Sequence, residues 1–294
     1  MSRIKLPDFE NKKQAFKYLR DNHDKIISLK SAEPIKSEEC SLGCSGLSMS
    51  KDSIEKYEKT EGEQIKDSSH IKADPIGTLK EGEIKVKAYA NVIGWCDSHY
   101  DVLIKDSAKK TIKDKGASNK QLIYHLKNHG RTTDDVIGKH VKMSLEDIEL
   151  NQFNIVSDIK QTQVIVGESV VSEAYDQKCF KLYSDNEIKQ HSIGLMYIKM
   201  FFCMDSDEDE DAMYKENFDR YFPEVINKDK VKESGYFWAV TQIRLLEYSA
   251  VLWGSNELSI TADYEPSEDT QKEEDKGEPL KNTDFERKRK LSII

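Results

Sequence analysis

The sequence predicts an α+β protein that is mainly antiparallel β, with a sheet or barrel, surrounding helices and a charged extension at each end. Strand-like segments outnumber helical ones between residues 81 and 261, and they do not alternate regularly with helices as they do in parallel α/β folds. Large apolar side chains are scarce in 35–80 and in 262–294, so we expect one core domain between these segments.

The core elements are predicted from hydrophobic periodicity and from turn residues. Residues 83–92 place Ile84, Val86, Ala88, Ala90 and Val92 at every second position, which is typical of a half-buried strand. Gly116 is expected to end a short helix that precedes the second large group of strands. Further strands are predicted at 121–129, 138–150, 163–171 and 191–204, with two more between 236 and 253, and helices at 106–115, 172–182 and 214–226.

The two extensions have different characters. Residues 12–29 predict an amphipathic helix, which either docks on the core of this chain or serves as a handle for a partner. The helix is followed by Pro34 and by a linker, 35–80, that is rich in Ser, Glu and Lys. Residues 262–294 form an acidic run with a basic end and predict a disordered charged tail. The apolar side chains expected on one face of the helix are Phe16, Leu19, Ile26 and Ile27.

Composition excludes several classes of protein. The 294 residues are 37% hydrophobic and 34% charged, with a net charge of −9, and an acidic chain is repelled by phosphates, so we expect no nucleic-acid partner. The polar N-terminus predicts no signal peptide, and no apolar run approaches the ~20 residues that span a bilayer. Five dispersed cysteines indicate reduced thiols. We therefore expect a soluble cytoplasmic protein with no membrane partner.

Ser192 is the first candidate for catalysis, because it lies at the start of a long apolar strand after a helix. A serine hydroxyl becomes a nucleophile only beside a base, and that base needs a third group to fix its tautomer. His129 and His125 lie close together on one predicted strand, and either one can supply the base. Glu247 lies in an apolar run, where a carboxylate is costly unless it is paired, and an imidazole would satisfy it. Further options are His140 and His191, but neighbours on a strand point to opposite faces, so His191 is not expected to serve Ser192 directly. A satisfied core histidine with a salt-bridged Glu247 is the structural alternative.

Four segments, in order, resemble the prohead protease family of tailed bacteriophages, whose fold is related to the herpesvirus assemblins. The resemblance covers about residues 84–260. The segments are the strand 88–92 with the turn 94–102, His129 followed by Ile137-Gly138, Ala174-Tyr175 leading to Ser192-Ile193-Gly194, and Leu246-Glu247-Tyr248-Ser249-Ala250-Val251. The stretch after His129 is longer than in the family, and Val136 stands where the family has a proline, so His125 stays open as the base.

The resemblance implies an assemblin-like fold and a Ser-His-Glu endopeptidase without a cofactor. Carried over by position, Ser192 is the nucleophile, His129 the general base and Glu247 the orienting acid. The implied substrates and partners are the major capsid protein and the scaffold inside the procapsid in the host cytoplasm, with self-cleavage, and a homodimer is allowed. The alternative is a catalytically inactive capsid-assembly or scaffold protein with a protease-like fold.

Other combinations of residues favour structural roles. Residues 205–211 with Glu216 resemble a calcium-binding loop, but Glu210 stands where the sharp turn requires glycine, so a solvated acidic loop is expected. A zinc site is disfavoured because its four candidates are two pairs far apart in sequence, and two further cysteines are in apolar surroundings where thiols are inert. Two aspartates near residue 100 are expected to be turn residues. The zinc candidates are Cys40, Cys44, Cys96 and His99; the inert cysteines are Cys179 and Cys203; the aspartates are Asp97 and Asp101.

Overall fold

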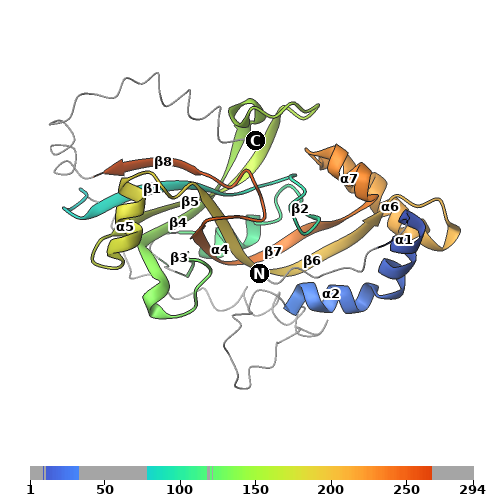
Figure 1. The fold of residues 1–294 in the computed structure, drawn as a ribbon, viewed down its shortest axis with the longest axis horizontal. Coiled ribbons are helices and arrows are strands. Elements are labelled where there is room, and N and C mark those ends of the chain that lie inside the picture. The colour runs from blue at the N-terminus through green and yellow to red at the C-terminus, as the bar shows by residue number, and fades with distance from the viewer. Residues whose placement is uncertain (1–8, 10, 33–77, 118–119, 121, 267–294) are drawn as a thin grey trace.

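The protein is an α+β structure built on one strongly curved sheet of eight strands that is mostly antiparallel and does not close (Figure 1). This computed structural model describes residues 9, 11–32, 78–117, 120 and 122–266. The expected mainly antiparallel α+β fold is confirmed at this level. Most of the predicted linker and the tail beyond residue 266 lie outside the described residues.

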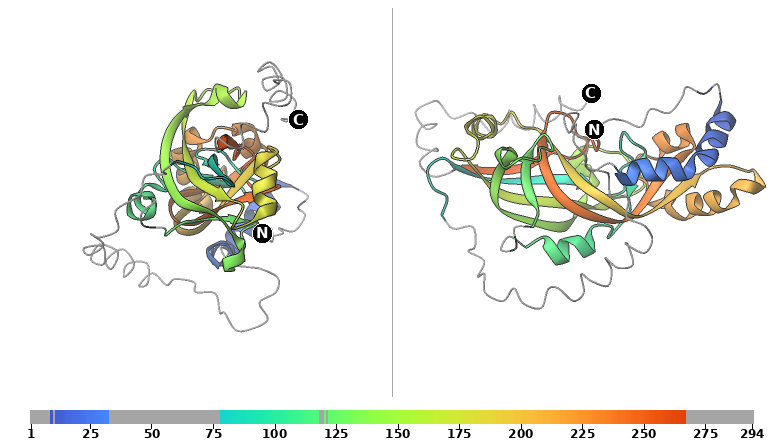
Figure 2. Two further views of the ribbon diagram at one scale, coloured as in Figure 1. Left: turned by 90° about the vertical axis from the view of Figure 1, so that its left-hand side faces the viewer. Right: turned by 90° about the horizontal axis from the view of Figure 1, so that it is seen from below.

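The sheet has the order β2-β7-β3-β4-β5-β1-β8, and β6 pairs with the other edge of β7. A single bridge between Gln190 and Ile260 links β6 to the segment before β8, so the two ends of the sheet approach each other without a continuous ladder. Figure 2 shows the resulting curvature from the end of the molecule. The strands are β1 (Glu83–Val92), β2 (Asp101–Leu103), β3 (Tyr124–Lys127), β4 (Val136–Glu149), β5 (Gln161–Ser172), β6 (Gln190–Met204), β7 (Tyr236–Val251) and β8 (Thr261–Pro266).

Most of the helices lie at the two ends of the sheet, and the short helix α4 (Lys109–Lys115) lies near its middle (Figure 1). Figure 1 shows α5 (Gln177–Ser184) at one end, while α1 (Lys12–Asp21), α2 (His23–Ala32), α6 (Ala212–Tyr221) and α7 (Lys228–Ser234) lie at the other. Helix α4 ends at Gly116, as predicted, and Gly116 N–H bonds to the Ile112 carbonyl.

Strand β7 is the central element, because it pairs with three others. It is antiparallel to β6 over nearly its whole length, and parallel to β2 at one end and to β3 at the other. The prediction of two strands between 236 and 253 is therefore wrong. Register shifts opposite Gly194 and Lys199 interrupt the alternation of side chains, which made one long strand resemble two short ones.

Three other predicted boundaries need correction. Ala174 and Tyr175 lie in the turn before α5 rather than on a helix, because Asp176 caps the helix by accepting from the Cys179 N–H. Residues 262–266, predicted as the start of the tail, belong to β8, which pairs with β1. The helix predicted at 12–29 is two helices, separated at Asn22.

The N-terminal helices are docked on the far end of the β6–β7 pair, in agreement with the expectation that this segment packs on the core of the chain. Leu19 and Ile26 are buried in a cluster with Phe202 and Trp238. Beneath them Lys30 Nζ lies 2.5 Å from Asp101 Oδ1, and both side chains are almost fully buried. Asp101 is therefore part of a buried ion pair at the start of β2, and not simply a turn residue.

The acidic loop 205–211 contacts α1 rather than facing only solvent. Arg20 Nη1 lies 3.0 Å from Asp211 Oδ1 and 2.8 Å from Glu210 Oε1, and Lys13 pairs with Glu208. Asp211 is buried and also accepts from Ser206 Oγ. The expectation of a solvated loop is wrong for Asp211, which anchors the N-terminal extension.

Candidate active site

The residues predicted to act together come from two neighbouring strands and the turn after β3. Ser192 of β6 lies directly opposite Ser249 of β7, and Gly194 lies opposite Glu247. Opposed residues of an antiparallel pair project from the same face, with Cβ atoms ~5 Å apart, and residues two apart on one strand share that face. All four therefore lie on one face of the sheet, and His129 reaches this face from the turn.

A closed ring of hydrogen bonds joins His129, Glu247 and Ser249. His129 Nδ1 lies 2.7 Å from Glu247 Oε1, Ser249 Oγ donates to Glu247 Oε2 at 2.6 Å, and the His129 backbone N–H donates to Ser249 Oγ at 3.1 Å. A carboxylate only accepts hydrogen bonds, so this contact assigns the imidazole proton to Nδ1. The Nε2 atom then keeps the lone pair that a general base requires.

The turn after β3 directs His129 back over β7. Asn128 and His129 have φ of 53° and 56°, a left-handed conformation in which Asn and His are enriched among non-glycine residues. The Asn128 N–H donates to the Ala250 carbonyl at 3.0 Å, so β7 holds both turn residues through their backbone. His129 consequently does not lie on the strand predicted at 121–129, which ends at Lys127.

Gly194 makes room for the carboxylate of Glu247. A Cβ atom at position 194 would lie 2.0 Å from Glu247 Oε1, far inside van der Waals contact. Any side chain here would displace Glu247 and break its contact with His129. The Ser-x-Gly spacing at 192–194 thus has a steric reason. Ser192 and Gly194 are successive positions on one face of β6, and the missing side chain at Gly194 leaves the space that the Glu247 carboxylate occupies.

Access to this set increases from the serine toward the histidine. Ser192 is 6% exposed, whereas the side chains of Glu247 and His129 are 12% and 26% exposed. Within the described part of the chain, Ser192 Oγ makes no hydrogen bond to His129.

His125, the alternative base, lies on the opposite face of the sheet. It pairs in register with Tyr248, the residue between Glu247 and Ser249, and its ring stacks on Tyr248 at 4.2 Å. It is fully buried, and burial holds the pKa of His125 well below its ordinary value. His191 is also fully buried, and its pKa is lowered by burial to about 3. Neither imidazole shares a face with Ser192.

Two members of this site were not assigned a role from the sequence. Ser249 completes the ring around Glu247, and Gly194 leaves the space for it. The sequence did place Glu247 with Ser249, and Ser192 with Gly194, on one face of a strand, because residues two apart on a strand share a face. It did not reveal the register of β6 against β7, which brings the two pairs together.

The other candidates are not assembled into a reactive site. Burial raises the pKa of Cys179 to about 11 and that of Cys96 and Cys203 to about 12, so these thiols stay protonated at neutral pH. Among the described residues, no group of three His, Cys, Asp or Glu side chains is placed to hold a metal ion. Cys40 and Cys44 lie outside the described residues.

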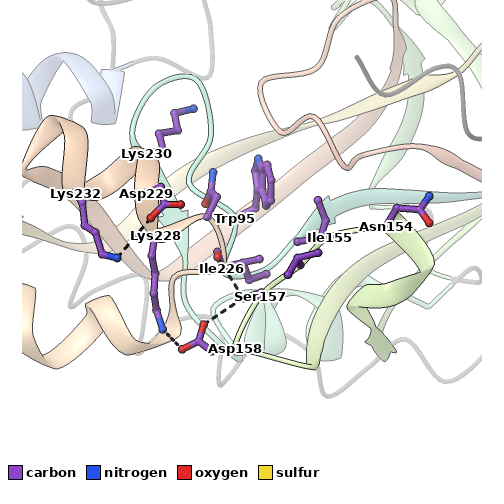
Figure 3. A pocket seen from close by; sticks show the side chains of 12 residues that line it. Trp95, Asn154, Ile155, Ser157, Asp158, Ile226, Lys228, Asp229, Lys230 and Lys232 are labelled. Atoms are coloured by element: carbon purple, nitrogen blue, oxygen red, sulfur yellow. Dashed lines mark hydrogen bonds and ion pairs between the residues drawn. The ribbon is translucent and has the colours of Figure 1, made fainter.

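A separate hollow of about 530 Å³ lies between the loop 154–158 and the start of α7 (Figure 3). It shares no residue with the candidate active site. Of its three lysines, Lys228 pairs with Asp158 at 2.5 Å, Lys232 lies 3.5 Å from Asp229, and Lys230 lies over the Tyr100 ring.

None of the helices in the described residues has the length and apolar character that crossing a bilayer requires. Comparisons of the chain with known protein families, with curated proteins and with solved structures found no match.

Proposed function

We propose that this protein is a serine endopeptidase in which Ser192 is the nucleophile, His129 the general base and Glu247 the orienting acid. The observation that carries the proposal is the 2.7 Å contact between His129 Nδ1 and Glu247 Oε1, on the face of β7 that adjoins Ser192 of β6. An acid, an imidazole and a serine on one face are the groups that acyl transfer requires.

The chemistry follows from the orientation of the imidazole. His129 Nε2 accepts the proton of Ser192 Oγ as the oxygen attacks the carbonyl carbon of a peptide bond, and Glu247 stabilises the imidazolium that forms. The same proton then passes to the leaving amine, the C–N bond breaks, and an ester remains on Ser192. Water activated by His129 hydrolyses this ester and regenerates the serine.

The substrate class rests on the four ordered segments that resemble the prohead proteases. We propose that the substrates are extensions of the major capsid protein and scaffold, with self-cleavage, inside a procapsid. A shared assemblin-like fold and a homodimer belong to the same proposal. A catalytically inactive assembly protein with the same fold is the outcome that the following experiment separates from it.

The test uses the full-length chain and a fluorophosphonate probe, which phosphonylates an activated serine: the serine oxygen bonds to phosphorus and fluoride leaves. The wild-type protein should be labelled on the peptide that contains Ser192, as mapped by mass spectrometry. Ser192→Ala and His129→Ala should lose labelling. Ser144→Ala, on a half-exposed position of β4, and His140→Asn, which preserves a left-handed backbone, are matched controls that should retain it. A folded wild-type protein that is not labelled would favour the inactive assembly protein.

A further inference from the structure

A second polar cluster lies on the inner face of the same strands, beneath the candidate active site. It consists of five side chains that are at most 2% exposed. Tyr183 Oη lies 3.1 Å from His125 Nε2 and 2.9 Å from His191 Nε2. His125 Nδ1 lies 2.8 Å from Ser169 Oγ, which accepts from Tyr248 Oη at 2.8 Å.

The two histidines are joined through Tyr183, whose hydroxyl accepts from one imidazole Nε2 and donates to the other. Either direction is compatible with neutral histidines, which agrees with the lowering of both pKa values by burial, and His191 Nδ1 is buried without a hydrogen-bond partner among the described residues. The cluster is therefore a continuous series of hydrogen bonds from Tyr248 to His191.

Glycines on the neighbouring strands leave room for the side chains of this polar cluster. A Cβ atom at Gly138 of β4 would lie 2.8 Å from both His125 Nδ1 and Ser169 Oγ. A Cβ atom at Gly167 of β5 would lie 2.9 Å from the Tyr248 ring. Two neighbouring strands thus lack side chains at the points where the cluster needs room.

Strands β3, β6 and β7, which position the candidate active site, each contribute one side chain to the polar cluster. His191 immediately precedes Ser192, Tyr248 immediately follows Glu247, and His125 lies on β3, whose end leads into the turn at His129. The helix that carries Tyr183 is also fixed to β3, because Lys127 Nζ lies 2.5 Å from Asp176 Oδ2 at the helix N-cap.

We propose that Tyr183 is a positioning residue whose hydroxyl, by bridging His191 and His125, sets the strand that bears Ser192 against the strand that leads to His129. This inference rests on the proposed function. Its consequence is that removal of the hydroxyl slows acylation of Ser192 in correctly folded molecules, since small displacements of reacting groups are costly in rate.

The test compares Tyr183→Phe with Tyr236→Phe in the full chain, using the fluorophosphonate probe. Tyr236 is a buried tyrosine at the far end of β7, so it controls for the loss of a buried hydroxyl. Two quantities are measured: the fraction of molecules whose Ser192 is labelled at completion, and the maximal labelling rate per labelled molecule. A merely structural role lowers the fraction, whereas positioning lowers the rate.

We expect Tyr183→Phe to keep the labelled fraction and the probe concentration for half-maximal rate, and to lower the maximal rate about 10-fold or more. Tyr236→Phe should match the wild type. His191→Gln, which keeps a side-chain acceptor for Tyr183, should be slowed less than His191→Leu. The double variant Tyr183→Phe with His191→Leu should be no slower than the slower single variant.

Two outcomes overturn the proposal in different ways. If the wild type is labelled and Tyr183→Phe is labelled at the wild-type rate, the positioning role is wrong and the proposed function stands. If folded wild-type protein is not labelled at Ser192, the proposed function and the positioning role fall together.

Discussion

At the scale of single residues, the candidate site depends on a glycine as much as on its reactive groups. Gly194→Ala would place a methyl group in the space of the Glu247 carboxylate. We expect this variant to fold with a loss of about 1–3 kcal/mol from overpacking and to lose most labelling at Ser192. Thermal unfolding and probe labelling check the two parts separately, and wild-type labelling of Gly194→Ala would contradict the role of Glu247.

The third member of the set is tested by an isosteric change. Glu247→Gln retains an acceptor for His129 Nδ1–H but cannot stabilise the imidazolium, so turnover should be slowed without being abolished. With the amide oxygen facing His129, the amide NH2 faces Ser249 Oγ and can donate to it, so the ring should persist. Ser249→Ala, which breaks the ring but keeps the charge, is the informative comparison. Unchanged cleavage in Glu247→Gln would make Glu247 a structural acid.

The sequence suggested Ser192, His129 and Glu247, but it did not contain their arrangement. Alternation on one strand follows from the chain itself, and it correctly separated His191 from the face of Ser192. The two left-handed residues at 128 and 129 were not visible, because Asn-His carries no glycine signal. The choice between His125 and His129 also could not be made from the sequence, because it depends on which face of β7 each imidazole contacts.

At the scale of elements, the N-terminal helices belong to the folded core, although they precede it by a long linker. Removing one partner of a buried ion pair leaves an uncompensated charge, which typically costs about 3–5 kcal/mol. Lys30→Met should therefore destabilise the protein by this amount, because burial already raises the pKa of Asp101 and Lys30 opposes that rise.

The matched control for this prediction removes both charges. Lys30→Met combined with Asp101→Asn should recover most of the lost free energy of unfolding, measured by urea denaturation. Equal stability of the single variant and the wild type would show that the helices are not held by this pair. A fragment of residues 82–261, the extent of the core domain expected from the sequence, would lack the helices that cover Phe202 and Trp238 and would expose this cluster.

Prediction of the elements succeeded where periodicity was regular and failed where it was interrupted. Strands β1 and β6 were predicted to within one residue, because each carries a continuous pattern. Strand β7 was divided in two, since register shifts opposite β6 disturb its alternation. Strand β8 was placed in a tail because its polar residues become a strand only through pairing with β1.

At the scale of the whole molecule, two buried neutral histidines make stability depend on pH. Folding lowers the pKa of His191 from 6.5 to about 3 and also lowers that of His125. Below the unfolded value, the unfolded chain binds protons that the folded protein does not, so stability falls as pH falls. Each such histidine contributes a loss of about 1.4 kcal/mol per pH unit between its two pKa values.

Urea denaturation at pH 7, 6 and 5 measures this dependence. The free energy of unfolding should decrease below pH 6.5, and His191→Gln should show a shallower decrease than the wild type. His140→Asn, at a position that is only half-buried, serves as the control and should keep the wild-type slope. Parallel pH profiles for wild type and His191→Gln would contradict the burial of a neutral imidazole.

The central place of β7 also fixes when, during synthesis, the candidate site can form. Glu247 lies 118 residues after its partner His129, and β7 is the last long strand of the sheet. Until residues 236–251 have left the ribosome, β3 and β6 lack the strand with which both pair, and His129 lacks its contacts with Glu247 and Ser249. Contacts of such long sequence separation form late and slowly. The proposed activity would therefore begin only in a chain that extends at least through residue 251.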